Sequence, residues 1–456
     1  MKKFAFALAA LCAGVSLYAQ NDEVQYNQYG VKVDVDPLVA EAQDGILVLR
    51  SKNSGYKIWL DNRVQVDGAY FFGEPDYAEE IGSGVSIRRA RFAVKGQIDS
   101  KWYGEVDMDM ADGCFELKDA IIRYDGIKNM HIQAGNFKEF FSIQRNNSSR
   151  YLMFMERPMI TNALAPSRHI GVNALYYDKG LWLSGGLFFS ECKGSEERTY
   201  VEENNKSYGQ DDGISATVKA IYMPGWNKTD WGMHIAGAFS YRTPKMSGES
   251  LNNNRFSTRN TTSINRKKYL DTDIFGPVDH DLLYTAELAG YWKGLRYEAV
   301  YMADDSFLKA GGSKHFGGWY AQASYLLFGG RQRYDNAGAK FTRVQRGKDW
   351  GDIEVCARIE NIDLNADRAL PLADQKLMGG SAMAYSFGVN YYVNDHVKFV
   401  VNYQYNDQDR YASGKGNKFT VGYNKSGIPT QDPKRVASAQ QGVDYSMVSF
   451  RMEIDF

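Results

Sequence analysis

Apolar and polar residues alternate along many segments of the chain, and this period of two limits its fold more than any other feature. The last twelve residues, YSMVSFRMEIDF, show the pattern. Its apolar face holds Val448, Phe450, Met452, Ile454 and Phe456, and its polar face holds Ser449, Arg451, Glu453 and Asp455. Successive side chains of a β-strand point to opposite faces, so such segments predict strands with one apolar and one polar face. Arginine at Phe450 should then be costly, whereas arginine at Ser449 should be tolerated.

Sixteen segments of this kind can be placed, and the connections between them alternate in length. The expected strands are residues 56–72, 85–99, 102–110, 115–125, 130–136, 168–178, 181–190, 212–223, 231–242, 281–290, 294–303, 316–328, 350–362, 380–393, 396–406 and 442–456. Connections after odd-numbered strands are long and those after even-numbered strands mostly short, which is typical of an outer-membrane barrel. The exception, 329–349, is either an extended periplasmic turn or the place of a further strand pair.

The chemistry of the two faces separates a membrane barrel from a soluble β-sandwich. In a sandwich the inner faces are large and apolar. Here the apolar face is rich in Tyr, and the other face carries Arg, Glu and Asp, a density of charge that no packed interior tolerates. The negative mean hydropathy agrees with a barrel, because lumen-facing and lipid-facing residues average out. We therefore expect an all-β, transmembrane antiparallel barrel of about sixteen strands.

The first twenty residues, MKKFAFALAALCAGVSLYAQ, have the pattern of a secretory signal peptide. Two lysines precede an apolar run that ends at Leu17, and Ala19 offers a cleavage site. A lipoprotein signal is less favoured, because Leu11 rather than a small residue precedes Cys12. The expected parts are a signal peptide at 1–20, a periplasmic lead at 21–55 and the barrel at 56–456. This organisation predicts a location in the outer membrane of a Gram-negative bacterium.

Cysteine, histidine and charge content argue against several other classes of protein. After the signal peptide the chain keeps Cys114, Cys192 and Cys356, an odd number at wide spacing, so neither a disulfide framework nor a zinc site is indicated. The six histidines share no metal-ligand spacing, and no nucleophile elbow or phosphate-binding glycine loop occurs. A formal net charge of −1 gives no basic excess for nucleic acid. We expect no enzyme, no cofactor and no metal.

Cationic residues gather on one expected strand, SIRRARFAVKGQID. Alternation sends Arg89, Arg91 and Lys95 to the lumen and Arg88 to the barrel rim. A guanidinium group stays charged and offers a planar fork of donors to phosphate-like oxygens. This file of cations predicts a path for small anions.

Acidic residues on the next strand, EVDMDM, leave a second interpretation open. Glu105, Asp107 and Asp109 also face inward and should lie beside the arginines. The cations would then form lumen ion pairs, or one side of the transverse charge field of a general, weakly selective porin. A third interpretation is a structural or adhesive barrel with a blocked lumen.

The connection 137–167, FKEFFSIQRNNSSRYLMFMERPMITNALAPS, is too long for a turn and too apolar for a solvated loop. We expect it to fold into the lumen as a third loop that narrows the pore, the alternative being an ordinary surface loop. Its cations should meet Arg89 and Arg91 across the throat and bind anions there. The candidate anion-binding residues are Arg145, Arg150 and Arg157 of this segment and Arg168, the first residue of the next expected strand. The basic segment 243–280 is interpreted as a vestibule or a solvated loop.

Several segments resemble the phosphate-selective porin O and P family, in the form widespread in Bacteroidetes. They include IRRARFAVKG, IQAGNFKEFF, GGWYAQASYLLFGG, WGDIEVCARIENIDL and FGVNYYVNDHVKFVVNYQY, in family order along residues 56–456. The resemblance implies a sixteen-stranded trimeric barrel, an inward-folded third loop and an arginine-lined path for anions such as phosphate or polyphosphate. Arg89 and Arg91 match the family's RRAR strand, and Arg157 and Arg168 match its third-loop region. The family's longer arginine ladder and its lysine cluster at the mouth find no aligned counterpart here.

Overall fold

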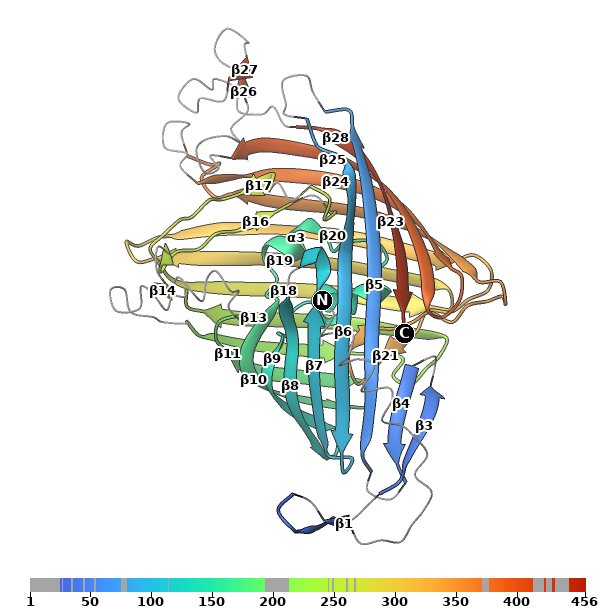
Figure 1. Cartoon of the computed structure of the whole chain (residues 1–456). Coiled ribbons are helices and arrows are strands. Elements are labelled where there is room, and N and C mark those ends of the chain that lie inside the picture. Colours follow the sequence, from blue (N-terminus) through green and yellow to red (C-terminus); the bar gives the residue numbers. More distant parts are fainter. Residues whose placement is uncertain are drawn as a thin grey trace.

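Within the described residues, sixteen antiparallel strands close into a barrel in the computed structural model (Figure 1). The structure describes residues 25–26, 28–33, 36–43, 46–52, 55–74, 80–113, 115–192, 213–244, 246–247, 250–259, 261–265, 268–370, 377–412, 422–423, 429–430 and 443–456. The signal peptide expected at 1–20 and the cysteine at position 114 lie outside these ranges.

The wall strands follow the expected ones to within a few residues at most ends. They are β5 (Lys57–Phe72), β6 (Gly84–Ile98), β7 (Trp102–Asp109), β8 (Glu116–Ile127), β9 (Met130–Lys138), β10 (Arg168–Asp178), β11 (Leu181–Phe188), β12 (Ser215–Tyr222), β13 (Trp231–Arg242), β18 (Val278–Trp292), β19 (Leu295–Leu308), β20 (Ser313–Leu326), β23 (Asp352–Asn365), β24 (Met378–Tyr392), β25 (Val397–Ala412) and β28 (Tyr445–Asp455). The predicted fold class is confirmed.

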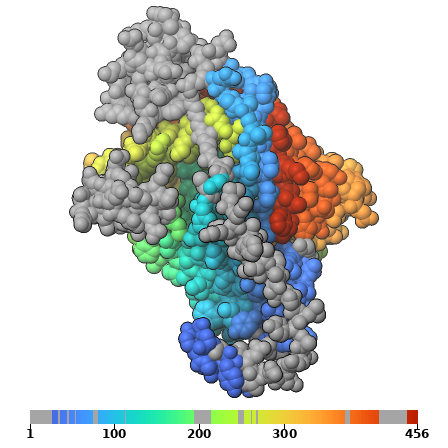
Figure 2. All heavy atoms as spheres, in the orientation of Figure 1, coloured from blue at the N-terminus to red at the C-terminus, as the bar shows by residue number. Residues whose placement is uncertain are grey.

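The barrel closes where its last strand pairs with its first. β28 runs antiparallel to β5 from the pair Ser446 and Phe72 to the pair Asp455 and Arg63. Figure 2 shows this seam as blue strands lying directly beside red ones. Closure leaves no unpaired wall edge, which is the condition for a sheet that crosses a bilayer.

The two faces of the wall differ as the alternation predicts. On β28 the apolar side chain of Phe450 is 50% exposed and faces outward, whereas its neighbour Ser449 is 1% exposed and faces the lumen. Large apolar side chains are exposed in the same way on the other wall strands, and most buried polar and charged groups lie on the inner face. Among the described residues, no helix is long and apolar enough to cross a membrane.

The described part of the lead segment 21–55 forms two hairpins. β1 (Gln25–Tyr26) pairs with β2 (Lys32–Val33), and β3 (Leu38–Gln43) pairs with β4 (Ile46–Ser51). β4 connects the second hairpin to the wall. It pairs with the first residues of β5, ahead of the part that β28 covers, so the second hairpin continues the sheet beyond the barrel at the lower end of β5 in Figure 1.

The remaining short elements lie in the connections. They are η1 (Ala111–Gly113), α2 (Ile143–Asn146), η2 (Ser149–Tyr151), α3 (Met159–Ala163), β14 (Met246–Ser247), β15 (Ser250–Leu251), β16 (Ser257–Thr258), β17 (Leu270–Asp271), β21 (Tyr334–Asp335), β22 (Lys340–Phe341), β26 (Gly422–Tyr423) and β27 (Pro429–Thr430). The long connection 327–351 is an extended turn that carries the β21–β22 hairpin. No wall strand is missing there, because β20 and β23 pair directly with each other.

Candidate functional site in the lumen

The cationic file of β6 faces the lumen, and acidic partners lie beside it. Arg91 donates from Nε to Asp107 at 2.8 Å, and a second bond joins the same two groups. Lys95 donates to Asp61 at 2.6 Å. The acids of β7 and β5 therefore neutralise much of this file, as the lumen-pairing interpretation predicts.

The prediction that Arg88 lies at the barrel rim is wrong. The ladder between β5 and β6 shifts by one residue between Gln65 and Val66, so Arg88 is the extra residue of a β-bulge. A bulge re-aims the side chains around it, and Arg88 and Arg89 both turn inward. Arg88 donates from Nε to Glu156 at 2.5 Å, and Arg89 lies 3.8 Å from the same carboxylate. Simple alternation cannot reveal this change of parity.

The third loop, residues 139–167, contacts inward-facing side chains of widely separated wall strands. Its backbone N–H groups donate to Glu287 on β18, to Glu360 on β23 and to Asn402 on β25. Its apolar side chains pack into a buried cluster with residues of the wall. The members of this cluster from the loop are Phe141, Ile143, Met159, Ile160, Leu164 and Ala165. The length and apolar composition of the segment are thus used for contacts with the barrel's interior-facing residues.

An acid of the third loop contacts the first two cations of β6. Glu156 contacts Arg88 and Arg89 and lies 3.2 Å from Arg451 of β28. Burial alone raises the pKa of Glu156, but these three guanidinium groups hold it well below its ordinary range. Arg150 of the loop shares Asp61 with Lys95, and Arg168 shares Asp119 with Arg91, so these cations approach the file through shared carboxylates. Opposite charges meet here, because gathered like charges repel in a poorly solvated site.

Two of the candidate cations are paired with carboxylates of the wall. Arg150 contacts Asp61 and lies 3.0 Å from Asp455. Arg168 holds Asp119 with two hydrogen bonds, at 2.9 and 2.7 Å. Arg150 links the third loop to the wall, and Arg168 links β10 to β8, so both side chains are paired with carboxylates.

Arg145 and Arg157 differ from the other candidates, since backbone carbonyls hold them. Arg157 donates to the carbonyls of Gln144 at 2.6 Å and Asn147 at 3.0 Å, and Arg145 donates to that of Thr161 at 3.1 Å. No ion pair joins either arginine to a carboxylate of the described residues. Burial, reinforced by neighbouring arginines, lowers the pKa of Arg157 to about 9 and that of Arg145 to about 10.

Unused hydrogen-bond donors surround these two arginines. The Nε group of Arg145 and the Nδ2 groups of Asn146 and Asn147 are buried and have no hydrogen-bond partner. An unsatisfied buried donor is unfavourable by about 1–3 kcal/mol. These groups are donors of the kind that an anion accepts hydrogen bonds from.

The sequence interpretation missed a second set of lumen cations, on β12, β19, β23 and β28. Each contacts an inward acid: Lys219 with Glu287, Arg296 with Glu298, Arg358 with Glu360, and Arg451 with Asp67. A signal for two of them exists in the segments RYE and RIE. An arginine and a glutamate two residues apart on a strand share one face.

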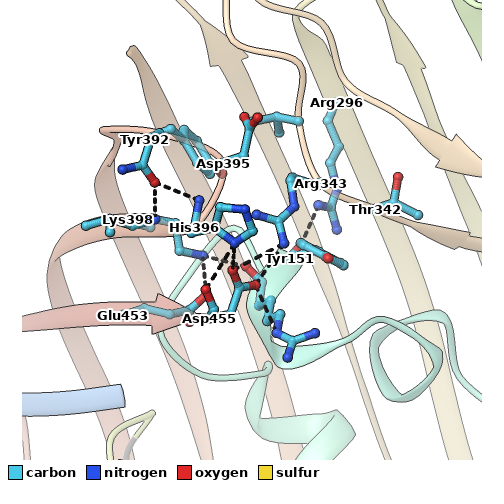
Figure 3. Close-up of a pocket in the computed structure, with 14 residues that line it drawn as sticks. Tyr151, Arg296, Thr342, Arg343, Tyr392, Asp395, His396, Lys398, Glu453 and Asp455 are labelled. Atoms are coloured by element: carbon cyan, nitrogen blue, oxygen red, sulfur yellow. Dashed lines mark hydrogen bonds and ion pairs between the residues drawn. The ribbon is translucent and has the colours of Figure 1, made fainter. Parts of the chain in front are cut away.

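A small pocket of about 30 Å³ lies where β25 begins and β28 ends (Figure 3). Asp455 lies at its centre, 3.0 Å from both Arg343 and His396. Glu453 lies 3.9 Å from Lys398. Cations and acids thus lie side by side around this pocket, as Arg91 and Lys95 of β6 lie beside acids of β7 and β5.

Comparison with known sequences places the chain among porins. The sequence model of the family described as phosphate-selective porin O and P matches residues 58–422. Porin O of Pseudomonas aeruginosa is 22% identical over 431 residues, covering 85% of this chain and 91% of the relative. A protein of Caulobacter vibrioides, described as uncharacterized, is 27% identical over 335 residues. That match covers 71% of this chain and 63% of the relative, a little less than two thirds of its length.

Solved structures with the same fold include two outer-membrane proteins of low sequence identity. The anion-selective porin from Comamonas acidovorans has a TM-score of 0.51 at 9% identity and covers 88% of this chain and 100% of its own. The trimer form of OmpT from Vibrio cholerae has a TM-score of 0.50 at 11% identity, and the match covers 88% of this chain and 99% of the OmpT chain. These likenesses support the architecture of the barrel.

Proposed function

Because the chain belongs to the phosphate-selective porin O and P family, its barrel spans the outer membrane of a Gram-negative bacterium, and we propose that it passes small anions by passive diffusion. The observation that carries this proposal is the buried pair Arg145 and Arg157, which backbone carbonyls hold and which form no ion pair with a carboxylate of the described residues. Uncompensated cations in a throat of low dielectric constant lower the energy of an anion there. The permeant anions would include phosphate and polyphosphate, which guanidinium groups bind well.

In this proposal the third loop forms the narrowest part of the pore. Its contacts with β18, β23 and β25 support that position, because they link it to strands on different sides of the lumen. Arg145 and Arg157 would bind the anion directly. The paired cations Arg89, Arg91, Lys95, Arg150 and Arg168 would supply further donors along the path.

A general, weakly selective porin is the second candidate. The ion pairs of Arg91 with Asp107 and of Lys95 with Asp61 favour this candidate, because paired charges cancel much of the field that selects an anion. We also propose a homotrimer, in line with the trimer form of OmpT, whose barrel has the same fold.

The two candidates differ in the reversal potential of the pore. Purified protein in a planar bilayer under a KCl gradient should give a potential of the anion-selective sign. Exchanging Arg145→Gln and Arg157→Gln together should shift it toward zero, because the uncompensated charge is removed. A matched control changes Arg331→Gln and Arg346→Gln, whose ion pairs are at the exposed periplasmic turn, and should leave the potential unchanged. A cation-selective wild-type pore would overturn the proposal.

A further inference from the structure

We propose a second solute site in the lumen, on the periplasmic side of the third loop, that binds a hydroxylated organic anion such as a sugar phosphate. The site is a cavity of about 290 Å³ between the wall strands β8–β10, the third loop and the β21–β22 hairpin. This inference rests on the proposed channel function, because the solute reaches the cavity through the lumen.

The periplasmic turn 327–351 builds one wall of the cavity by folding into the barrel. Trp182 of β11 donates to the carbonyl of Ala337 at 2.9 Å. The N–H group of Phe341 donates to Asn147 of the third loop at 2.9 Å. Ala339 is fully buried against inward-facing side chains of the wall. The turn and the third loop thus meet inside the barrel, and the cavity lies beside their contact.

The amide groups that line the cavity have unused hydrogen-bonding capacity. Asn146 is 8% exposed and neither its Nδ2 nor its Oδ1 has a partner, and Asn173 is 2% exposed with a free Oδ1. Gln133 adds a third amide to the lining. Donors and acceptors therefore face the same space. Hydroxyl groups match such a lining, because each hydroxyl donates and accepts.

The charged groups of the lining leave one cation for an anionic group of the solute. Arg123 and His131 both contact Asp125, at 2.8 and 2.5 Å. Asp335 accepts a backbone N–H group of its own turn at 3.0 Å. Lys340 forms no ion pair with any described residue. Its ammonium group is therefore available to a phosphate or carboxylate.

The size of the cavity favours an organic anion over an inorganic one. At about 30 Å³ per water molecule, the space has room for roughly ten separate waters. Covalently bonded atoms lie closer together than waters do, so the five heavy atoms of inorganic phosphate leave more than half of the space empty, whereas the sixteen of a hexose phosphate fill most of it. Phe140 and Leu175 give the lining an apolar patch on which a carbon skeleton packs. A sugar phosphate combines the size, the hydroxyl groups, the apolar ring face and the single anionic group that the lining requires.

Calorimetric titration of the detergent-folded full chain tests the site, with glucose 6-phosphate as the probe. Wild-type protein should bind the probe more tightly than inorganic phosphate and glucose, by at least tenfold. Lys340→Gln should weaken binding by about tenfold, because the ammonium partner is lost. The matched control Lys348→Gln lies on the exposed part of the same turn and should bind as the wild type does. Asn146→Ala is a second variant, which should also weaken binding while the barrel keeps its heat-modifiable migration.

Three results would overturn this site: no binding of glucose 6-phosphate, equal binding of inorganic phosphate, or an affinity that Lys340→Gln and Asn146→Ala leave unchanged. The bilayer recordings separate this failure from failure of the channel proposal. An anion-selective pore without calorimetric binding rejects only the cavity. A cation-selective pore with variant-sensitive binding rejects only the anion channel.

Discussion

At the scale of the residue, buried charges hold the third loop against the wall. Glu139, its first residue, is fully buried and accepts from Thr217 at 2.7 Å and from Arg242 at 3.1 Å. Burial alone raises the pKa of Glu139, but Arg242, His169 and Thr217 together lower it to about 2, from an ordinary value of 4.5. The ionised form is therefore the one that the folded protein binds best.

The depressed pKa of Glu139 predicts a pH-dependent contribution to stability. A carboxyl group with a lower pKa in the folded state stabilises it above about pH 4.5, and this contribution is lost as the pH falls toward 2. Glu139→Gln should lower the free energy of unfolding by about 3 kcal/mol at pH 7, from 1.36 kcal/mol per unit of pKa, and by much less near pH 2. Urea titration of detergent-folded protein measures the free energy of unfolding at each pH. Glu191→Gln, at an exposed position, is the control, and an equal loss at both pH values would refute the assignment.

At the scale of the element, the wall strands follow their alternation except where the backbone adds a residue. β25 and β28 keep a strict period of two, so their faces are readable from the sequence. β6 loses that period at Arg88, because a bulge inserts this residue into the strand. The position of the bulge is set by the pairing with β5, which the sequence of β6 alone does not display. The sequence of a strand also does not predict what packs against its inner face. Ser449 borders Phe154 and Glu156 of the third loop in a pocket of only about 10 Å³.

The faces of β28 predict two different penalties. Phe450→Arg places a charge on the lipid face and should lower the free energy of unfolding by about 2–4 kcal/mol near the middle of the bilayer. Phe450→Leu keeps an apolar group there and is the control. Ser449→Arg is also expected to be unfavourable, contrary to the expectation from alternation alone, because the side chain must displace the third loop. Heat-modifiable migration and urea unfolding in vesicles measure the penalties at both positions. A Phe450→Arg protein as stable as the Phe450→Leu protein would contradict the outward assignment of Phe450.

At the scale of the whole molecule, two connections from opposite ends of the barrel contact each other. The third loop follows β9 on the external side, and the turn 327–351 follows β20 on the periplasmic side. They touch through Asn147 and Phe341, and Arg296 of the wall lies over the ring of Phe341 at 3.8 Å. In the proposed channel, a solute would pass these two segments in series.

Resistances in series predict how conductance responds to shortening each segment. Deleting about fifteen residues around 143–157 should raise single-channel conductance and weaken block by phosphate, because Arg145 and Arg157 leave with the loop. Replacing 334–341 by a short glycine turn should raise conductance less. The two changes together should give more than the sum of the single increases, since each remaining obstacle limits the other. Conductance unchanged by the loop deletion would show that the segment is external to the permeation path.

The sequence by itself determined the wall: sixteen strands, their faces and the alternation of long and short connections. Those properties follow from a local period of two and from turn residues, which a linear sequence displays. It also identified the third loop and four cations in it or next to it, Arg145, Arg150, Arg157 and Arg168. Only the tertiary structure decided which charges cancel, because the partners of Arg88, Arg150 and Arg451 come from segments far apart in the chain. The inward path of 327–351 was likewise invisible, since it depends on side chains such as Trp182 on the opposite wall.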